Sequence, residues 1–250
     1  LAEQARALEG TARRRKFSEA AYAFSNLIHS DVERHRHAAC AEQARICLDR
    51  QTSEYDPGEA ERLVSGRPDV IFHLAAIVSG EAEADFDKGY RINLDGTRHL
   101  IDAIRAEGGG YKPRLVFTSS IAVFGAPFPE KIGDEFFHQP LTSYGTQKAI
   151  CELLLADYTR KGYIRGRSTR LMTVSVRPGK PNGAASGFFS GMVREPLAGL
   201  KGACPVARQV EVALSSPNRT IDGLLRVGQT TDAEWGPRTA INMPALVTTV

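Results

Sequence analysis

Two apolar segments separated by an amphipathic helix pattern constrain the fold of this chain more strongly than any other feature of its sequence. Residues 70–76 and 114–120 are each predicted to form a buried strand that ends in small or hydroxyl-bearing side chains. Between them, residues 93–104 carry apolar side chains at helical spacing, and Gly108 is expected to end that helix. Strands that alternate with helices predict an α/β fold built on a doubly wound parallel sheet, in which ligands bind at the carboxyl ends of the strands.

A tyrosine and a lysine stand one helical turn apart in the segment 143–148, so a helix there would place Tyr144 and Lys148 on one face. A free tyrosine has a pKa near ~10, and a neighbouring ammonium group favours the phenolate and lowers that value. The pair is therefore a candidate for proton transfer to and from an alcohol. The spacing alone is weak support, because any exposed helix can carry it. A third candidate, the hydroxyl of Ser120, ends a predicted strand at the sheet edge where ligands bind.

Motifs spread over residues 56 to about 200 resemble the extended short-chain dehydrogenase/reductase family, whose members include NAD-dependent epimerases and dehydratases. In order along the chain they are His73-Leu74-Ala75-Ala76, Asn93-Leu94-Asp95-Gly96-Thr97, Ser119-Ser120, Tyr144 to Lys148, and Val174-Ser175-Val176-Arg177-Pro178-Gly179. The segments 76–87 and 187–197 are similar to those of family members that oxidise small sugar acids. The resemblance implies a Rossmann-like dinucleotide-binding domain over residues 1–178 and a small substrate-binding part over residues 179–250.

The resemblance also implies roles for individual residues. Catalytic roles are implied for Ser120, Tyr144 and Lys148, with the tyrosine as the proton-transfer group. Cofactor contacts are implied for Leu74, Ala75, Ala76, Asn93, Ser119, Tyr144, Lys148, Pro178 and Gly179, and substrate contacts for Ser79, Ser120, Asn182 and Arg194. The implied cofactor is NAD, with NADP not excluded. The implied reaction is oxidation of the 2-hydroxyl of a small sugar acid to the 2-oxo acid.

Several of these residues have a structural interpretation that the sequence leaves open. Ser119 could satisfy a strand end, Asn93 could be an ordinary helix N-cap, and Arg194 could be a solvated surface charge. His73, at the end of a strand, is more typical of a hydrogen-bonded core histidine than of a catalyst. Glu152 is expected to lie on the polar outer face of its helix.

The first 55 residues lack the glycine-rich turn that the family uses to hold the dinucleotide pyrophosphate. They contain a single glycine, Gly10, and no apolar run that predicts a strand. Family-like sequence resumes near residue 56, although the length of chain before Val70 is close to what the family's first strands and helices occupy. Our hypothesis is that part of residues 1–55 is an out-of-frame translation of a dinucleotide-binding segment. The choice between NAD and NADP depends on this segment.

Charge and hydropathy favour a protein that acts on a small molecule rather than on nucleic acid or a membrane. The net charge is only +3, so no nucleic-acid-binding surface is expected. No apolar run approaches the ~18 residues of a membrane span, and reduced cysteines in the cytoplasm are predicted. His35, His37, Cys40 and Cys47 lack the paired spacing of zinc ligands, so no metal site is predicted.

Three functions are compatible with the sequence. The first is the NAD-dependent sugar acid dehydrogenase described above. The second is a nucleotide-sugar epimerase or dehydratase with the same catalytic residues, although the about 70 residues after Gly179 are fewer than its substrate lobe usually needs. The third is a catalytically impaired remnant that lacks the pyrophosphate-binding turn. The family often forms dimers through the helices that match residues 93–104 and 144–158, so a homodimer is also implied, although both faces could equally be core.

Overall fold

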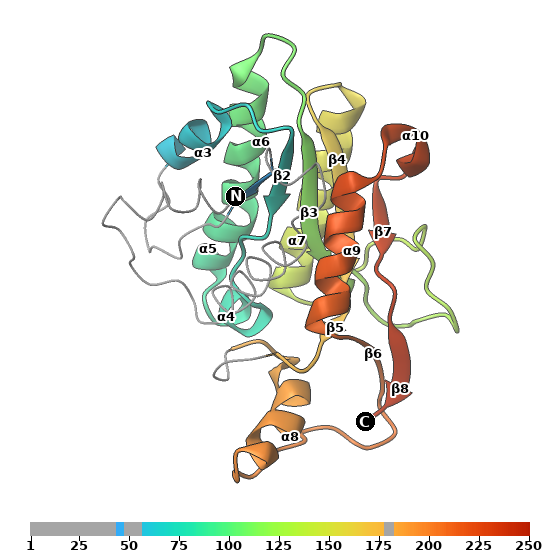
Figure 1. Cartoon of the computed structure of the whole chain (residues 1–250). Coiled ribbons are helices and arrows are strands. Elements are labelled where there is room, and N and C mark those ends of the chain that lie inside the picture. The colour runs from blue at the N-terminus through green and yellow to red at the C-terminus, as the bar shows by residue number, and fades with distance from the viewer. Residues whose placement is uncertain (1–43, 48–56, 178–182) are drawn as a thin grey trace.

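A five-stranded parallel sheet forms the centre of the computed structural model, which describes residues 44–47, 57–177 and 183–250 (Figure 1). The strands are β1 (Ala44–Cys47), β2 (Val70–His73), β3 (Arg114–Ser120), β4 (Arg165–Leu171) and β7 (Ala240–Asn242). They lie in the order β1-β2-β3-β4-β7, and every neighbouring pair runs parallel. The predicted α/β fold with a parallel sheet is confirmed.

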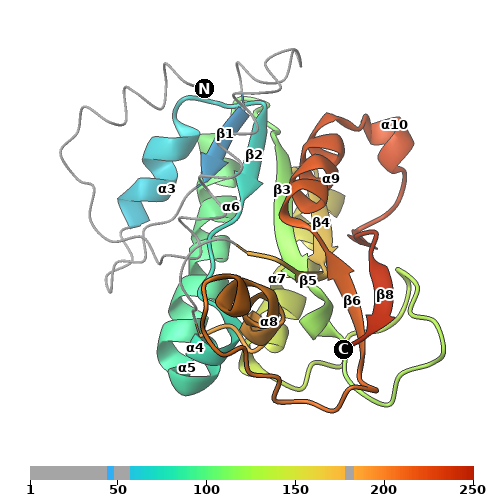
Figure 2. The ribbon, with the colours of Figure 1, turned by 60° about the horizontal axis from the view of Figure 1, so that its bottom comes forward.

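Helices cover both faces of this main sheet, as a doubly wound fold requires. On one face lie α3 (Pro57–Val64), α6 (Gly96–Glu107) and α7 (Ser143–Arg160), and on the other lie α9 (Pro217–Gln229) and α10 (Asp232–Trp235) (Figures 1 and 2). Successive strand residues point to opposite faces, so β2 and β3 contribute to both cores. Ile71, Leu115 and Phe117 pack with α6 and α7, whereas Val70, Phe72 and Val116 pack with α9. Pairing of two copies through α6 and α7 stays a prediction.

β1 adds a strand from the first 55 residues to the main sheet. It pairs with β2 along its whole length, from Ala44 opposite Val70 to Cys47 opposite His73. Arg45 interrupts the run of apolar residues over 44–47, so the sequence pattern does not mark this strand. The remaining N-terminal residues, including three of the four residues considered as metal ligands, lie outside the described part of the chain. The missing glycine-rich turn and the absence of a metal site there stay predictions.

The connection from β2 to β3 is more elaborate than a single helix. It contains α4 (Ser79–Ala84), α5 (Phe86–Gly89) and the π-helical segment η1 (Tyr90–Asp95) before α6 begins. Asn93 lies inside η1, so its interpretation as a helix N-cap is wrong. Gly108 does end α6, at a φ of 59° that glycine adopts without strain, as predicted.

β4 is the strand that the sequence pattern failed to predict. Residues 166–170 of this strand, Gly166-Arg167-Ser168-Thr169-Arg170, are all buried, yet they form no apolar run. In the family that the chain resembles, the motif that begins at Val174 holds the next strand and the turn after it, but here the chain joins the main sheet earlier, in β4. Only β5 (Thr173–Val174) follows, and it belongs to a second sheet.

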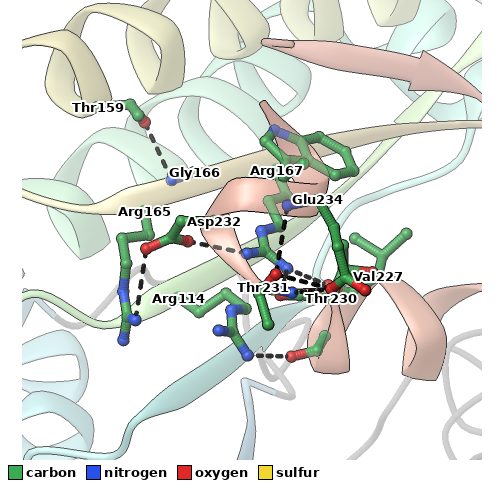
Figure 3. Close-up of polar contacts among 12 residues, drawn as sticks. Arg114, Thr159, Arg165, Gly166, Arg167, Val227, Thr230, Thr231, Asp232 and Glu234 are labelled. Carbon is green, nitrogen blue, oxygen red and sulfur yellow. Dashed lines mark hydrogen bonds and ion pairs between the residues drawn. The ribbon is translucent and has the colours of Figure 1, made fainter. Parts of the chain in front are cut away.

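Two arginines near the amino ends of β3 and β4 hold the carboxyl end of α9 (Figure 3). Arg167 is 1% exposed, and its guanidinium donates to the carbonyls of Val227 (2.5 Å) and Thr230 and to Oδ1 of Asp232 (2.9 Å). Arg114 donates to a further carbonyl of the helix at 2.5 Å. The last carbonyls of a helix lack intrahelical donors and carry partial negative charge, so these cations stabilise it on both counts.

The chain beyond residue 183 divides between the main sheet and a smaller one. α8 (Gly187–Leu197) and the three-stranded sheet of β5, β6 (Glu211–Ser215) and β8 (Leu246–Thr249) lie beyond the carboxyl ends of β2 and β3 (Figure 1). β7 and α9 return to the main sheet, so both sides of the predicted boundary at residue 179 contribute to it. In the part of the chain that the structure describes, no helix is both long and apolar enough to cross a membrane.

Candidate active site

Ser120 lies at the carboxyl end of β3, where the strand passes directly into the short 3-10 helix η2 (Ile121–Val123). Its Oγ accepts a hydrogen bond from the backbone N–H of Ala122 at 3.1 Å, so the side chain caps η2. The ladder between β3 and β4 extends to this residue, with Ser120 opposite Leu171. The position of the hydroxyl is therefore determined by the central sheet and not by a loose connection.

Tyr144 reaches Ser120 because the first turn of α7 packs directly on η2. The helix begins after Thr142, whose Oγ1 accepts a hydrogen bond from the N–H of Gly145 at 3.1 Å. A Cβ at Gly145 would lie 2.9 Å from the carbonyl carbon of Ala122 and closer still to its oxygen, so only glycine allows this approach. The Ser120 hydroxyl lies close enough to the Tyr144 phenol to favour its ionised form.

Lys148 lies one turn along α7 from Tyr144 and is only 2% exposed, so it is not a solvated helix charge. Its Nζ donates to the carbonyl oxygen of Thr118 at 2.7 Å and lies 5.7 Å from the centroid of the Tyr144 ring. Burial lowers the pKa of Lys148 to about 8, although interactions with Cys151 and Glu152 raise it in part. The structure thus brings the three predicted catalytic side chains to the carboxyl end of β3.

Burial also dominates the protonation of the tyrosine. It raises the pKa of Tyr144 to about 12, while the nearby Ser120 hydroxyl and the charge of Arg177 act in the opposite direction. The prediction that Lys148 brings this pKa below its usual value is wrong, because desolvation of the phenolate outweighs the nearby charges. The apolar residues that pack around the ring are Ile77, Ala82 and Ile92. At neutral pH the phenol is protonated and able to donate a proton.

Ser119 belongs to a buried ion-pair cluster behind the strand end. Its Oγ donates to Oε1 of Glu152 at 2.5 Å, and Oε2 of the same carboxylate pairs with Arg170 (2.8 Å) and His138 (2.9 Å). Glu152 is 3% exposed, so the prediction that it faces outward is wrong. Burial opposes its ionisation, but the three hydrogen bonds together hold the pKa of Glu152 below its usual value. The Ser119 hydroxyl is engaged within the protein, which favours its structural interpretation.

Asn93 links the segment after β2 to α7. Its Oδ1 accepts a hydrogen bond from the N–H of Ile77 at 2.8 Å, and its Nδ2 donates to Oε1 of Gln147 at 2.7 Å. His73 lies nearby with Nε2 2.8 Å from Oγ1 of Thr97, and burial together with the Lys148 charge lowers the pKa of His73 to about 3. The prediction of a hydrogen-bonded core histidine is confirmed.

The residues predicted to contact the cofactor are placed only in part. Leu74 to Ala76 follow β2 directly, at the same edge of the sheet as Ser120. Pro178 and Gly179 lie outside the described residues. Because β4 ends at Leu171, opposite Ser120, the first residue after the strand on that side is Met172. Met172 therefore lies at the same edge of the sheet as Ser120, and it could have been found from the sequence only if β4 had been placed correctly.

The residues predicted to contact the substrate hold the chain segments around the strand ends together. Ser79, at the start of α4, accepts a hydrogen bond through Oγ from the N–H of Ala185 at 3.1 Å. The next residue, Gly80, approaches the carbonyl of Gly183 so closely that no side chain would fit there. These contacts fasten the segment that leads into α8 onto α4. Asn182 falls outside the described ranges.

Arg194, on α8, contacts a second arginine, Arg177, which was not among the predicted site residues. Its Nη1 donates to the carbonyl oxygen of Arg177 at 3.0 Å, and its Nη2 lies 2.6 Å from Oε1 of Glu195. The backbone N–H of Arg177 donates to Oγ of the buried Ser190 at 3.0 Å. The positive charge of Arg177 also acts to lower the pKa of Tyr144.

Comparisons with known proteins agree with this geometry. Residues 25–212 match the model of the NAD dependent epimerase/dehydratase family. The D-erythronate dehydrogenase of Cupriavidus necator is 46% identical over 194 residues, which cover 78% of this chain and 59% of that protein. The D-erythronate dehydrogenase of Haemophilus influenzae is 43% identical over 194 residues, with 78% and 61% covered. The chain thus spans about three fifths of the length of these relatives.

A solved structure is similar over a larger share of the chain. The nucleoside-diphosphate-sugar epimerase from Agrobacterium tumefaciens is 48% identical, with a TM-score of 0.79 over 93% of this chain and 73% of that chain. The family match includes β3, which carries Ser120, and α7, which carries Tyr144 and Lys148. The chain belongs to the NAD-dependent epimerase/dehydratase family.

Proposed function

We propose that the protein is an NAD-dependent dehydrogenase that oxidises the 2-hydroxyl of a small sugar acid such as D-erythronate. The observation that supports this most strongly is the convergence of Ser120, Tyr144 and Lys148 at the carboxyl end of β3. Two relatives named D-erythronate dehydrogenase, at 46% and 43% identity, suggest the substrate class. Their agreement with the motif geometry makes a sugar acid the first compound to test.

In the proposed mechanism, Ser120 and Tyr144 both contact the hydroxyl oxygen that is oxidised. Ser120 donates a hydrogen bond that holds this oxygen in line, and the Tyr144 phenolate takes the hydroxyl proton. Bound NAD would supply the hydride acceptor, for which the protein has no chemical group of its own. Lys148 would favour the phenolate through its buried ammonium group, and its remaining N–H donors would hold the cofactor ribose.

The pKa of Tyr144 has a consequence for the direction of the reaction. With a pKa of about 12, the phenol is protonated at neutral pH and can donate its proton to a carbonyl oxygen. Oxidation needs the opposite state, so the fraction of molecules with a phenolate rises about tenfold for each pH unit below that pKa. The rate of sugar acid oxidation should therefore increase with pH well above neutrality.

The described part of the site fits the nicotinamide half of NAD. Lys148 uses one of the three N–H donors of its ammonium group on Thr118, and among the described residues it has no carboxylate partner at ion-pair distance. Such a buried cation at the sheet edge suits the vicinal hydroxyls of a ribose. The residues that would hold the pyrophosphate fall in the N-terminal part outside the described ranges. Because residues 1–55 lack the glycine-rich turn, we predict that the chain binds NAD weakly.

Nucleotide-sugar epimerisation is the second candidate, because the Agrobacterium protein at 48% identity is named as an epimerase of that kind. Such an enzyme would use the same proton-transfer residues. The two functions differ in substrate, since one acts on a small acid and the other on a sugar carried by a nucleotide. A substrate panel therefore separates them.

The test measures NADH formation by the full chain at high NAD concentration, with D-erythronate and with other small 2-hydroxy acids. Conversion of UDP-glucose to its epimer is followed separately, because epimerisation gives no net NADH. We expect NADH formation with D-erythronate, no conversion of UDP-glucose, and about a 10²–10⁴-fold loss of turnover in Tyr144→Phe. Thermal unfolding of Tyr144→Phe should match that of the wild-type protein, since only a hydroxyl is removed. Turnover of UDP-glucose without turnover of any small acid would assign the protein to the epimerases, and an active Tyr144→Phe would refute the mechanism.

A further inference from the structure

The guanidinium of Arg194, which was predicted to bind the substrate, already interacts with other groups of the protein. It donates to the carbonyl of Arg177 at 3.0 Å and pairs with Glu195 at 2.6 Å. The side chains of Arg194 and Glu195 are 22% and 17% exposed, so the pair is largely shielded from water. Because Glu195 already neutralises the charge of Arg194, the carboxylate of a ligand would have to compete with it.

Arg177 has a different environment, although the same segment holds it. Its main chain is fixed to α8 on both sides, because its N–H donates to Ser190 and its carbonyl accepts from Arg194. The residue is half-buried, and among the described residues no carboxylate pairs with its guanidinium. Burial and the charge of Arg194 lower the pKa of Arg177, and only Tyr144 acts to raise it. A partly desolvated cation without an anion is costly, and a bound anion would remove that cost.

We propose that Arg177 binds the carboxylate of the substrate and that Arg194 positions it by holding its backbone. This inference rests on the proposed function. In a 2-hydroxy acid the carboxylate carbon is bonded directly to the carbon that is oxidised, so the cation that binds it must lie close to Tyr144. A guanidinium presents two parallel N–H donors that match the two oxygens of a carboxylate. This pairing directs the 2-hydroxyl toward Tyr144 and Ser120.

The same contact explains selection of the substrate class. D-erythronate and the polyol erythritol share a four-carbon chain with neighbouring hydroxyls, but only the acid has a carboxylate. If Arg177 binds that group, the preference for the acid depends on this one side chain. A matched control is Arg208→Gln, which removes an exposed positive charge from the same C-terminal part of the chain.

The experiment measures equilibrium binding of D-erythronate and of erythritol to the full chain by calorimetry, with and without NAD. We expect the wild-type protein and Arg208→Gln to bind D-erythronate more tightly than erythritol. Arg177→Gln should bind D-erythronate about 10- to 100-fold more weakly, the range for loss of a charge-assisted hydrogen-bonded pair, with erythritol binding unchanged. Arg177→Lys should recover part of the loss, because it keeps the charge but not the paired donors.

Three results would overturn the inference: unchanged D-erythronate binding by Arg177→Gln, equal weakening of both compounds, or no preference for the acid in the wild-type protein. If Arg177→Gln does not fold, Arg177→Lys decides by its kinetics. A higher KM for D-erythronate with an unchanged KM for NAD supports the inference, and a higher KM for NAD alone refutes it. Failure of the proposed function would look different, since the wild-type protein would then turn over UDP-sugars only, or Tyr144→Phe would remain active.

Discussion

Replacement of Gly145 by alanine should reduce catalysis far more than stability, because this glycine sets the separation of Tyr144 and Ser120. A Cβ there would lie 2.9 Å from the carbonyl carbon of Ala122 and 3.1 Å from Cβ of Pro140. Non-bonded atoms need ~3.5 Å or more, so α7 and η2 would have to part by roughly 1 Å. No rotation of a side chain relieves the overlap with Ala122, because its backbone makes the contact. A displacement of this size in a catalytic pair lowers turnover about 10²-fold.

The effect on stability should be small, because two contributions oppose each other. Overpacking costs about 1–3 kcal/mol, and alanine gains about 1 kcal/mol over glycine inside a helix. The assay pairs kcat from NADH formation with the free energy of unfolding in urea. Gly133→Ala is the matched control, since its Cβ would meet no atom within 4 Å, and it should leave both quantities unchanged. A Gly145→Ala protein with wild-type kcat would refute the conclusion that this contact positions the catalytic pair.

Three further perturbations test the site and the fold. Lys148→Ala should lose both turnover and NAD affinity in kinetic and NAD-titration assays, because the buried ammonium serves tyrosine and ribose alike; unchanged NAD affinity would contradict this. The free energy of unfolding should fall as the pH drops from about 6.5 toward 3. In this range His73 binds a proton in the unfolded chain but not in the folded protein, where its pKa is lowered to about 3. His73→Gln should reduce this slope in urea titrations at fixed pH, and an identical slope would exclude His73 as the cause. Arg167→Met should destabilise the protein by about 3 kcal/mol or more through loss of the donors to Val227 and Thr230, measured by urea unfolding, with kcat unchanged at low temperature. Loss of kcat without loss of stability would contradict a purely structural role.

The sequence by itself determined the central strands and the catalytic helix. β2 and β3 are recognisable because both of their faces are buried, which requires nearly continuous apolar runs. Tyr144 and Lys148 lie one turn apart in any helix, so their common face follows from spacing alone. These features depend only on residues a few positions apart, so the local sequence pattern is enough to predict them.

Only the tertiary structure revealed β4 and the burial of Glu152. A polar side chain can be buried when its partners satisfy it, and those partners lie far away in the sequence. Arg167 bonds to the end of α9 some sixty residues later, and Glu152 pairs with Arg170 on the neighbouring strand. A sequence pattern shows the polar residue but not its partner, so both positions look exposed.

Only the tertiary structure, likewise, distinguished the two arginines near the site. The sequence pointed to Arg194 as the partner of the substrate carboxylate. In the structure, however, Glu195 neutralises Arg194, whereas no described carboxylate pairs with Arg177. For a related reason the sequence predicts a lowered pKa for Tyr144 whereas the structure raises it: the spacing of Lys148 is visible in the sequence, but the desolvation of the phenol is not. Spacing along a helix is a local property, whereas desolvation and charge compensation depend on every segment that packs around a group.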